Sequence, residues 1–257
     1  MKKIIAALTC TTMLATSALA DFARVEMGAG MWAQTPSGEM SYSDGSGATG
    51  VYSSEKKVGN NAYAWMLVKH PIPILPNIRL EYSSVKDSGI ISGKFKDFNA
   101  TAGTTGTIEI TEYDVIPYYN ILDNTFWMTV DLGVDIKLLQ TNYKANSVVL
   151  DSTLSTENYD DTLSLVLPLA YVRARVEIPG TNIGLEADGK YISYDGSTIY
   201  DARAKIDYTF DFVPVIQPAI EVGYRVQKFD LKYEDGADVT KLNIDFSGIY
   251  AGIMLRF

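Results

Sequence analysis

The sequence predicts an all-β fold, a transmembrane antiparallel up-and-down β-barrel of about ten strands that follows an N-terminal signal peptide. Three observations predict it: an export signal at the start, about ten segments in which apolar and polar residues alternate, and a last strand that ends in Phe257. Strands with one lipid-facing and one lumen-facing side are typical of outer-membrane barrels. Eight and twelve strands are the alternatives.

Residues 1–20 have the three parts of a cleavable signal peptide. Two lysines precede an apolar run over residues 4–14, and Ala18 and Ala20 offer a small-residue cleavage site. The apolar run is short and broken by threonines, whereas a spanning helix needs about 20 apolar residues. We therefore expect a signal peptide over residues 1–20 and a barrel over residues 21–257.

Composition excludes several classes of protein. Cys10 lies inside the signal in a poor context for lipidation, so the processed chain has no thiol and no disulfide. Removal of Lys2 and Lys3 with the signal peptide leaves 20 of the 22 basic residues against 31 acidic residues, so the processed chain has a formal charge of −11. This negative charge argues against a nucleic-acid partner. The mean hydropathy of +0.01 fits strands whose two faces cancel. No motif for a cofactor or a metal is present.

Two segments show the alternation most clearly. Over residues 127–139 the even positions are apolar and most odd positions are polar, and residues 198–212 repeat the pattern with Arg203 and Lys205 on the polar face. Eight weaker segments complete a set of ten, and an even count leaves both chain ends on one side. The weaker segments are 23–34, 62–69, 78–86, 107–119, 162–178, 183–193, 218–233 and 242–257.

The connections alternate between long and short. Long polar stretches, expected to be loops outside the cell, are 36–60, 87–106, 144–161 and 234–241. Short stretches, expected to be periplasmic turns, are 71–77, 120–125, 179–182 and 211–217. Asp195–Ser197 is expected to be a tight outer turn. Pro168 interrupts its segment where the apolar face changes, which predicts a β-bulge, and the face changes again near Lys228.

The cost of exposing a charge to lipid fixes which face is inward. Arg or Lys on the lipid face near the midplane costs about 2–4 kcal/mol, so the charged positions of each strand must face the lumen. The predicted lumen-facing charges are Arg24, Glu26, Arg79, Glu81, Glu112, Asp114, Asp131, Asp135, Lys137, Arg173, Arg175, Glu177, Glu186, Asp188, Lys190, Asp201, Arg203, Lys205, Asp207, Glu221 and Arg225. Both signs recur on most strands.

The last strand resembles the segment by which outer-membrane barrels are recognised for assembly, with Ile253, Leu255 and Phe257 at the matching positions. Four further motifs resemble an uncharacterised proteobacterial family of small outer-membrane β-barrel proteins, across the whole processed chain. They are residues 22–32, 73–82, 118–124 and 131–133. The resemblance implies the outer membrane of a Gram-negative bacterium and the barrel architecture, and it transfers no activity.

Three classes of function follow from the interior and the loops. The interior charges predict either a barrel filled by ion pairs, which mixed signs and a small lumen favour, or a channel for small solutes. Polar outer loops suggest a surface-interaction protein as an alternative. An outer-membrane hydrolase ranks below these, because His70 is the only histidine and lies in an expected turn. We therefore predict a protein that is not an enzyme.

The expected partners are outer-membrane lipids, lipopolysaccharide and the barrel-assembly machinery, and a monomer is favoured over an oligomer. Acidic residues of the outer loops match no calcium-binding spacing, so solvated loops explain them better than a metal site. A soluble β-sandwich after the signal peptide is the alternative fold. Its strands would be shorter than the alternating segments over 127–139 and 198–212.

Overall fold

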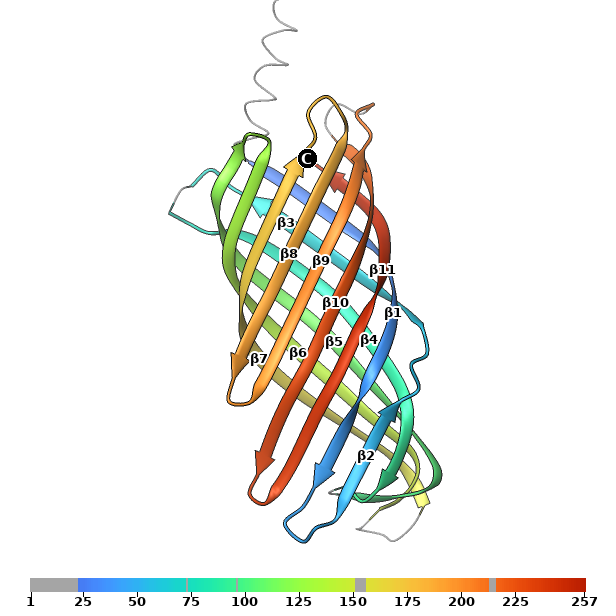
Figure 1. Ribbon diagram of the computed structural model, residues 1–257. Coiled ribbons are helices and arrows are strands. Elements are labelled where there is room, and N and C mark those ends of the chain that lie inside the picture. Colours follow the sequence, from blue (N-terminus) through green and yellow to red (C-terminus); the bar gives the residue numbers. More distant parts are fainter. Residues whose placement is uncertain (1–22, 73, 96, 151–155, 213–215) are drawn as a thin grey trace, which may run out of the picture.

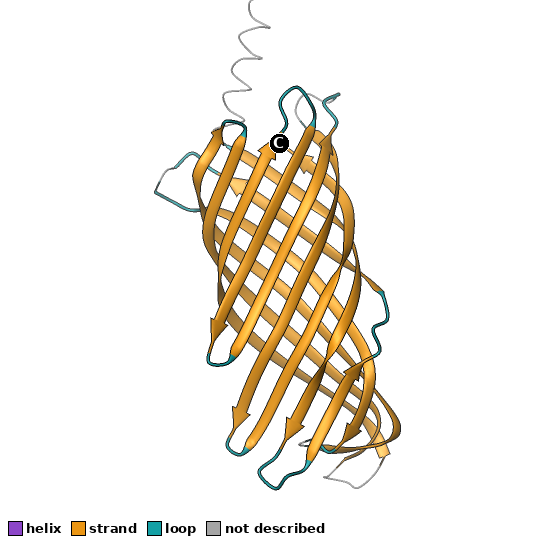
Figure 2. Ribbon diagram, in the orientation of Figure 1, coloured by secondary structure: helices purple, strands orange, loops and turns teal. Residues whose placement is uncertain are grey.

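The structure is a computed structural model that describes residues 23–72, 74–95, 97–150, 156–212 and 216–257, which contain eleven antiparallel strands (Figures 1 and 2). None of the described residues forms a helix that could cross a membrane. The strands are β1 (Arg24–Ser43), β2 (Thr49–Ser54), β3 (Gly59–Lys69), β4 (Asn77–Gly93), β5 (Phe98–Thr125), β6 (Met128–Leu150), β7 (Thr156–Glu177), β8 (Ile183–Tyr194), β9 (Ser197–Thr209), β10 (Gln217–Asp235) and β11 (Asp238–Arg256).

The sheet closes into a barrel because β1 pairs with β11 along almost its full length. β2 and β3 share one place in the ring, since both pair with β1 on one side and with β4 on the other. The eleven strands therefore fill ten places, which confirms the prediction of about ten. The start of β1 and Phe257 lie at the same end of the barrel, called here the near end, and the opposite end is the far end (Figure 1).

A bulge separates β2 from β3. Ser53 of β2 pairs with Glu39 of β1 and Gly59 of β3 pairs with Gln34, so five residues on one side face four on the other. Lys56, inside the bulge, has a positive φ of 56°. The extra residue moves the inward face from even to odd positions, and it accounts for the weak alternation of this part of the sequence.

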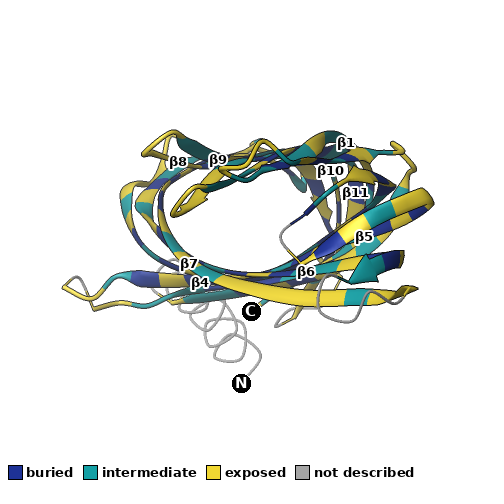
Figure 3. Cartoon of the chain, turned by 90° about the horizontal axis from the view of Figure 1, so that it is seen from below, coloured by how far each residue is buried: buried dark blue, intermediate teal, exposed yellow. Residues whose placement is uncertain are grey.

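The outside of the barrel changes character along each strand. Outward positions near the near end are apolar, as at Leu132, Val134 and Ile136 on β6, and these side chains are exposed. Outward positions closer to the far end are polar, as at Gln140 and Lys144 of the same strand. Figure 3 shows the alternation of buried and exposed residues along the strands. The apolar positions together form a band around the barrel.

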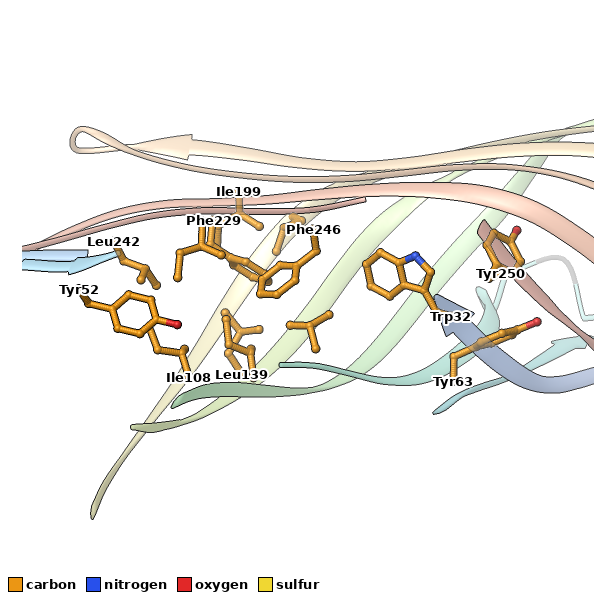
Figure 4. Packing of buried hydrophobic residues seen from close by; sticks show 14 of the residues in the cluster. Trp32, Tyr52, Tyr63, Ile108, Leu139, Ile199, Phe229, Leu242, Phe246 and Tyr250 are labelled. Atoms are coloured by element: carbon orange, nitrogen blue, oxygen red, sulfur yellow. The ribbon is translucent and has the colours of Figure 1, made fainter. Parts of the chain in front are cut away.

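The inside changes in the opposite sense at about the same height. On β6 the inward residues Asp135 and Lys137 are followed by Leu139, and on β10 the inward residue Arg225 is followed, after Gln227, by Phe229. The far-end interior is a packed hydrophobic core in which Phe229 and Phe246 face Ile108 and Leu139 (Figure 4). Charges therefore lie inside where the outside is apolar, and an apolar core lies inside where the outside is polar.

The bulge predicted at Pro168 is wrong. The register of β7 with β6 passes Pro168 without a shift, and Leu165 and Leu167 point inward on the same face as Arg173. The apolar residues move from the outward to the inward face, or the reverse, at Pro168 and near Lys228. At these points the outside changes from apolar to polar and the inside changes from charged to apolar, while the strand itself continues without a bulge.

Several predicted loops are also wrong. The polar stretches after residues 36, 87, 144 and 234 are mostly strand, because the barrel wall extends far beyond the apolar band. Their outward residues meet water, so polarity alone does not distinguish them from loops. At the near end residues 120–125 belong to β5, and the turn is formed by Phe126 and Trp127, whose φ angles are 54° and 62°.

Candidate functional site

The interior of the near-end half holds the side chains that sequence analysis assigned to the lumen. Nineteen of the 21 have side chains at most 9% exposed. The other two, Arg24 and Glu177, are 29% and 48% exposed and pair with each other at the near-end rim. Both remain on the inward face of their strands, so the whole set converges on one interior volume.

Two lysines form the centre of this volume. The Lys137 Nζ donates to Glu112 at 2.6 Å and to the two oxygens of Asp114 at 2.8 and 2.9 Å. The Lys190 Nζ donates to Glu81 at 2.6 Å and also to Asp114. Asp114 is therefore shared, and the two lysines join strands β4, β5, β6 and β8 across the barrel.

Arginines extend the network toward both ends. Arg173 donates to Asp131 at 2.6 Å and to Glu186 at 2.7 Å, which links β6, β7 and β8. Arg225 donates through two nitrogens to Asp201, at 2.9 and 2.6 Å. The planar guanidinium suits such two-point contacts with carboxylates. Arg175 and Arg203 make equivalent pairs with Asp207 and Asp188.

Aromatic side chains that sequence analysis did not assign to the site complete it. The Trp65 ring has the guanidinium of Arg79 at 4.9 Å and the ammonium of Lys205 at 4.4 Å from its centroid. Glu221 accepts hydrogen bonds from the Tyr63 hydroxyl at 2.8 Å and from the Trp65 indole at 3.1 Å. These cation–π contacts and hydrogen bonds satisfy charges that have little access to water.

A signal for these aromatics existed in the sequence. Inward positions of β1 and β11 hold glycines, and a Cβ at Gly28 would lie 2.6 Å from the Trp65 indole nitrogen. A Cβ at Gly252 would lie 2.4 Å from the Tyr63 hydroxyl. Glycine at an inward position of a strand therefore marks a place where a large side chain from another strand crosses the interior.

Two small cavities lie among the charged side chains of this half of the barrel. One cavity of about 10 Å³ lies among residues that include Trp32, Arg203 and Glu221, and one of about 20 Å³ lies at the near-end rim beside Arg24 and Lys69. A single water molecule needs about 10–15 Å³ of such space. Neither of these two cavities is larger than about two water molecules.

One carboxyl in the network differs from the others. Asp135 is fully buried, and neither of its oxygens accepts a hydrogen bond from a described residue. The closest cations are Lys190 at 3.7 Å and Lys137 at 3.9 Å, and both lysines make shorter contacts with other acids. Asp135 therefore contributes less to the network than Asp114 does.

The only histidine holds a turn. The His70 Nδ1 accepts a hydrogen bond from the Ile72 N–H at 3.1 Å, and its Nε2 lies 3.0 Å from the Pro76 carbonyl oxygen. The His70 N–H donates to the Asn77 Oδ1 at 3.0 Å. Both ring nitrogens are thus engaged within the β3–β4 connection. Among the described residues no group of three acidic, histidine or cysteine side chains could hold a metal ion.

The proposed assembly residues lie on the outward face of β11. Ile253 and Phe257 are exposed and Leu255 is half-buried. Phe257 also helps to close the barrel, because its N–H donates to the Val25 carbonyl at 2.9 Å. Sequence analysis missed Arg256, which points inward and reaches Glu26 at 3.1 Å and Asp207 at 2.8 Å. Ala18 and Ala20 lie outside the described residues.

Comparison with known proteins identifies the fold. No family model matches the chain, and no curated protein matches it, so the resemblance to an uncharacterised family stays a prediction. The outer-membrane protease OmpT of Escherichia coli is similar in structure, with a TM-score of 0.55, 9% identity, and coverage of 91% of this chain and 97% of that chain.

Two further matches are looser. The translocator domain of the autotransporter NalP of Neisseria meningitidis has a TM-score of 0.37 and 11% identity, covering 100% of this chain and 97% of its own. The toluene transporter TbuX of Ralstonia pickettii has a TM-score of 0.33 and 6% identity, covering 91% and 89%. At such identities the likeness concerns the β-barrel fold alone.

Proposed function

We propose that this chain is an integral outer-membrane β-barrel protein of a Gram-negative bacterium, exported with its signal peptide removed, and that its interior is a solid network of ion pairs. Its role is structural, or it presents its far end to the surroundings of the cell. One observation carries the proposal: where the outside of the barrel is apolar its interior is charged, and where the outside is polar its interior is an apolar core.

The height of the band supports a membrane location. On β6 the outward apolar residues run from Met128 to Leu138. Ten steps of about 3.3 Å along a strand tilted by about 40° give a height of roughly 25 Å, which is the height of the apolar band of outer-membrane barrels. The near end, where β1 starts and Phe257 lies, then faces the periplasm, and the far end, where the wall extends beyond the apolar band, lies outside the cell.

Closure of the interior supports a non-conducting barrel over a channel. A solute would have to separate buried pairs such as those of Lys137 and then pass the far-end core around Phe229. The alternative is a narrow channel for small solutes. Ions could pass only if water replaced these contacts, and breaking a buried pair costs about 3–5 kcal/mol.

Two experiments test this proposal in sequence. Outer-membrane fractionation with a heat-modifiability gel tests location and closure: we expect a band in the outer-membrane fraction that migrates differently before and after boiling. A chain that stays soluble after processing would overturn the location. Planar-bilayer recording then tests conduction: we expect no steps, or small and rare ones, from protein whose gel shift shows that it is folded. Large steady openings would support the channel.

We propose no catalytic role for His70, because its ring is engaged in the β3–β4 turn and no acidic side chain of a described residue orients it. We also propose that outer-membrane lipids and lipopolysaccharide surround the barrel and that the assembly machinery recognises its last strand. A Phe257→Ser variant should then accumulate in the periplasm. Correct assembly of that variant would contradict the recognition role.

A further inference from the structure

The hairpin of β8 and β9 is shorter than its neighbours, and this leaves β7 with a free edge. β7 pairs with β8 only over Ala170–Glu177, while it pairs with β6 over almost its whole length. The fourteen residues Thr156–Leu169 therefore pair with no described strand on their β8 side. Figure 1 shows that the β8–β9 hairpin ends well before the β10–β11 hairpin.

The hydrogen-bonding pattern shows which backbone groups face this free side. Along an antiparallel strand, successive residues point their N–H and C=O groups to alternate sides. The Glu177 N–H donates to the Trp127 C=O on the β6 side, and the Ile178 N–H donates to the Ile183 C=O on the β8 side. The register with β6 has no shift over residues 159–176. Even-numbered residues of β7 therefore face the free side.

Two positions on the free edge are protected, and the stretch between them is not. Pro168 faces the free side and has no N–H, which is the usual place for a proline in a sheet. The Thr162 N–H donates to the Asp161 Oδ1 at 2.8 Å. Between them, the N–H and C=O groups of Ser164 and Val166 have no hydrogen-bond partner among the described residues on that side.

The side chains of this stretch suit a further strand. Leu165 and Leu167 point inward and are only partly buried against the far-end core. Val166 points outward and is 65% exposed. The stretch from Thr162 to Leu167 carries no charge, whereas proteins usually protect an exposed edge with lysine, proline or a bulge.

We propose that the edge of β7 around Ser164 and Val166 binds an extended segment of a partner protein, which adds to the sheet as a strand. Free backbone groups require an extended backbone opposite them, and affinity in this binding mode comes from main-chain hydrogen bonds. Inward-facing residues of the partner are apolar, because they cover Leu165 and Leu167. The inference depends on the proposed function only for its location outside the cell.

The charges near the edge define one end of the partner. Asp160 and Asp161 precede the unprotected groups, and the nearest cation, Lys144, lies 3.5 Å from Asp160. An antiparallel partner therefore carries basic residues at its carboxyl end. A single extended chain fits better than a second barrel, because the edge faces a notch only two strand positions wide, between β7 and β10.

The test uses the peptide Val-Thr-Val-Thr-Val-Lys-Lys, labelled for fluorescence anisotropy, and full-length protein in lipid nanodiscs. Val166→Pro removes one N–H from the free side and no N–H that bonds to β6, because odd-numbered residues face β6. Val166→Ala is the matched control that keeps the N–H. We expect Val166→Pro to weaken binding by about tenfold or more and Val166→Ala to change it far less, since one backbone bond and its geometry are lost.

A heat-modifiability gel shows that each variant is folded, so that loss of binding reports on the edge. Hydrogen exchange should show protection of the Ser164 and Val166 amides when the peptide is bound. Absence of binding to the wild type, or equal binding to Val166→Pro, would overturn the proposal. So would a wild-type dimer in sedimentation that Val166→Pro dissociates, because a second copy would then occupy the edge.

Discussion

Replacing Lys137 by methionine tests whether buried ion pairs hold the barrel together. The Lys137 side chain is fully buried and donates three hydrogen bonds to Glu112 and Asp114. Methionine fills a similar volume, so the main effect is to leave two buried carboxylates with fewer partners. Removing one member of a buried pair costs about 3–5 kcal/mol. Lys190 still donates to Asp114, which puts the expected loss of unfolding free energy at the lower end, about 3 kcal/mol.

Lys144→Met is the matched control on the same strand. The Lys144 side chain is 52% exposed and lies 3.5 Å from Asp160, so its loss should cost about 0–1 kcal/mol. The assay is equilibrium urea unfolding from lipid vesicles, followed by the fluorescence of the three tryptophans, two of which are buried in the barrel. If the two variants lose stability equally, water solvates the interior, the network does not hold the barrel, and the channel alternative gains support.

Three smaller predictions follow from the same contacts. Asp135→Asn should cost much less unfolding free energy than Asp114→Asn in the same urea assay, because Asp114 accepts hydrogen bonds from both lysines and Asp135 accepts none from a described residue. Equal losses would contradict this. Burial raises the pKa of Asp87, which lies in the far-end half, so the charged form of Asp87 destabilises the fold above that pKa. Asp87→Asn should therefore raise the unfolding free energy at pH 8. The gain should be smaller at pH 4, where the wild-type carboxyl takes up its proton. His70→Ala should lower the melting temperature of the barrel without abolishing its assembly, whereas a variant that loses a measurable hydrolase activity would restore the enzyme hypothesis.

The fold was predictable because a single physical cost acts on every strand. Side chains that face lipid cannot be charged, so alternation in segments such as 127–139 fixes both the strands and their inward faces. The extent of the strands was not predictable in the same way. Beyond the apolar band, outward residues such as Gln140 and Lys144 meet water, and their polarity is the same in a strand as in a loop.

The site was predictable as a set of residues and not as a set of pairs. The inward positions of Lys190 and Glu81 follow from alternation, but their contact joins strands that lie far apart in the sequence and on different parts of the wall. Such a contact depends on the diameter and shear of the closed barrel, which no local pattern encodes. Arg256 was missed because its neighbours form the apolar terminal pattern, although its own position is inward.

The far-end core also explains why β7 can keep an open edge. Inside the apolar band every backbone group needs a partner, and β7 is paired on both sides there as far as Ala170. Its free edge starts at Leu169 and reaches the outer limit of the band at Val166, which pairs with Leu138. Beyond the band water can satisfy unpaired groups, and the wall is held instead by the contacts of Phe229, Phe246 and their neighbours. The barrel can therefore shorten β8 and β9 without losing its closure in the membrane. Most of the free edge lies beyond the band, where an unpaired strand costs least and where a partner outside the cell could reach it.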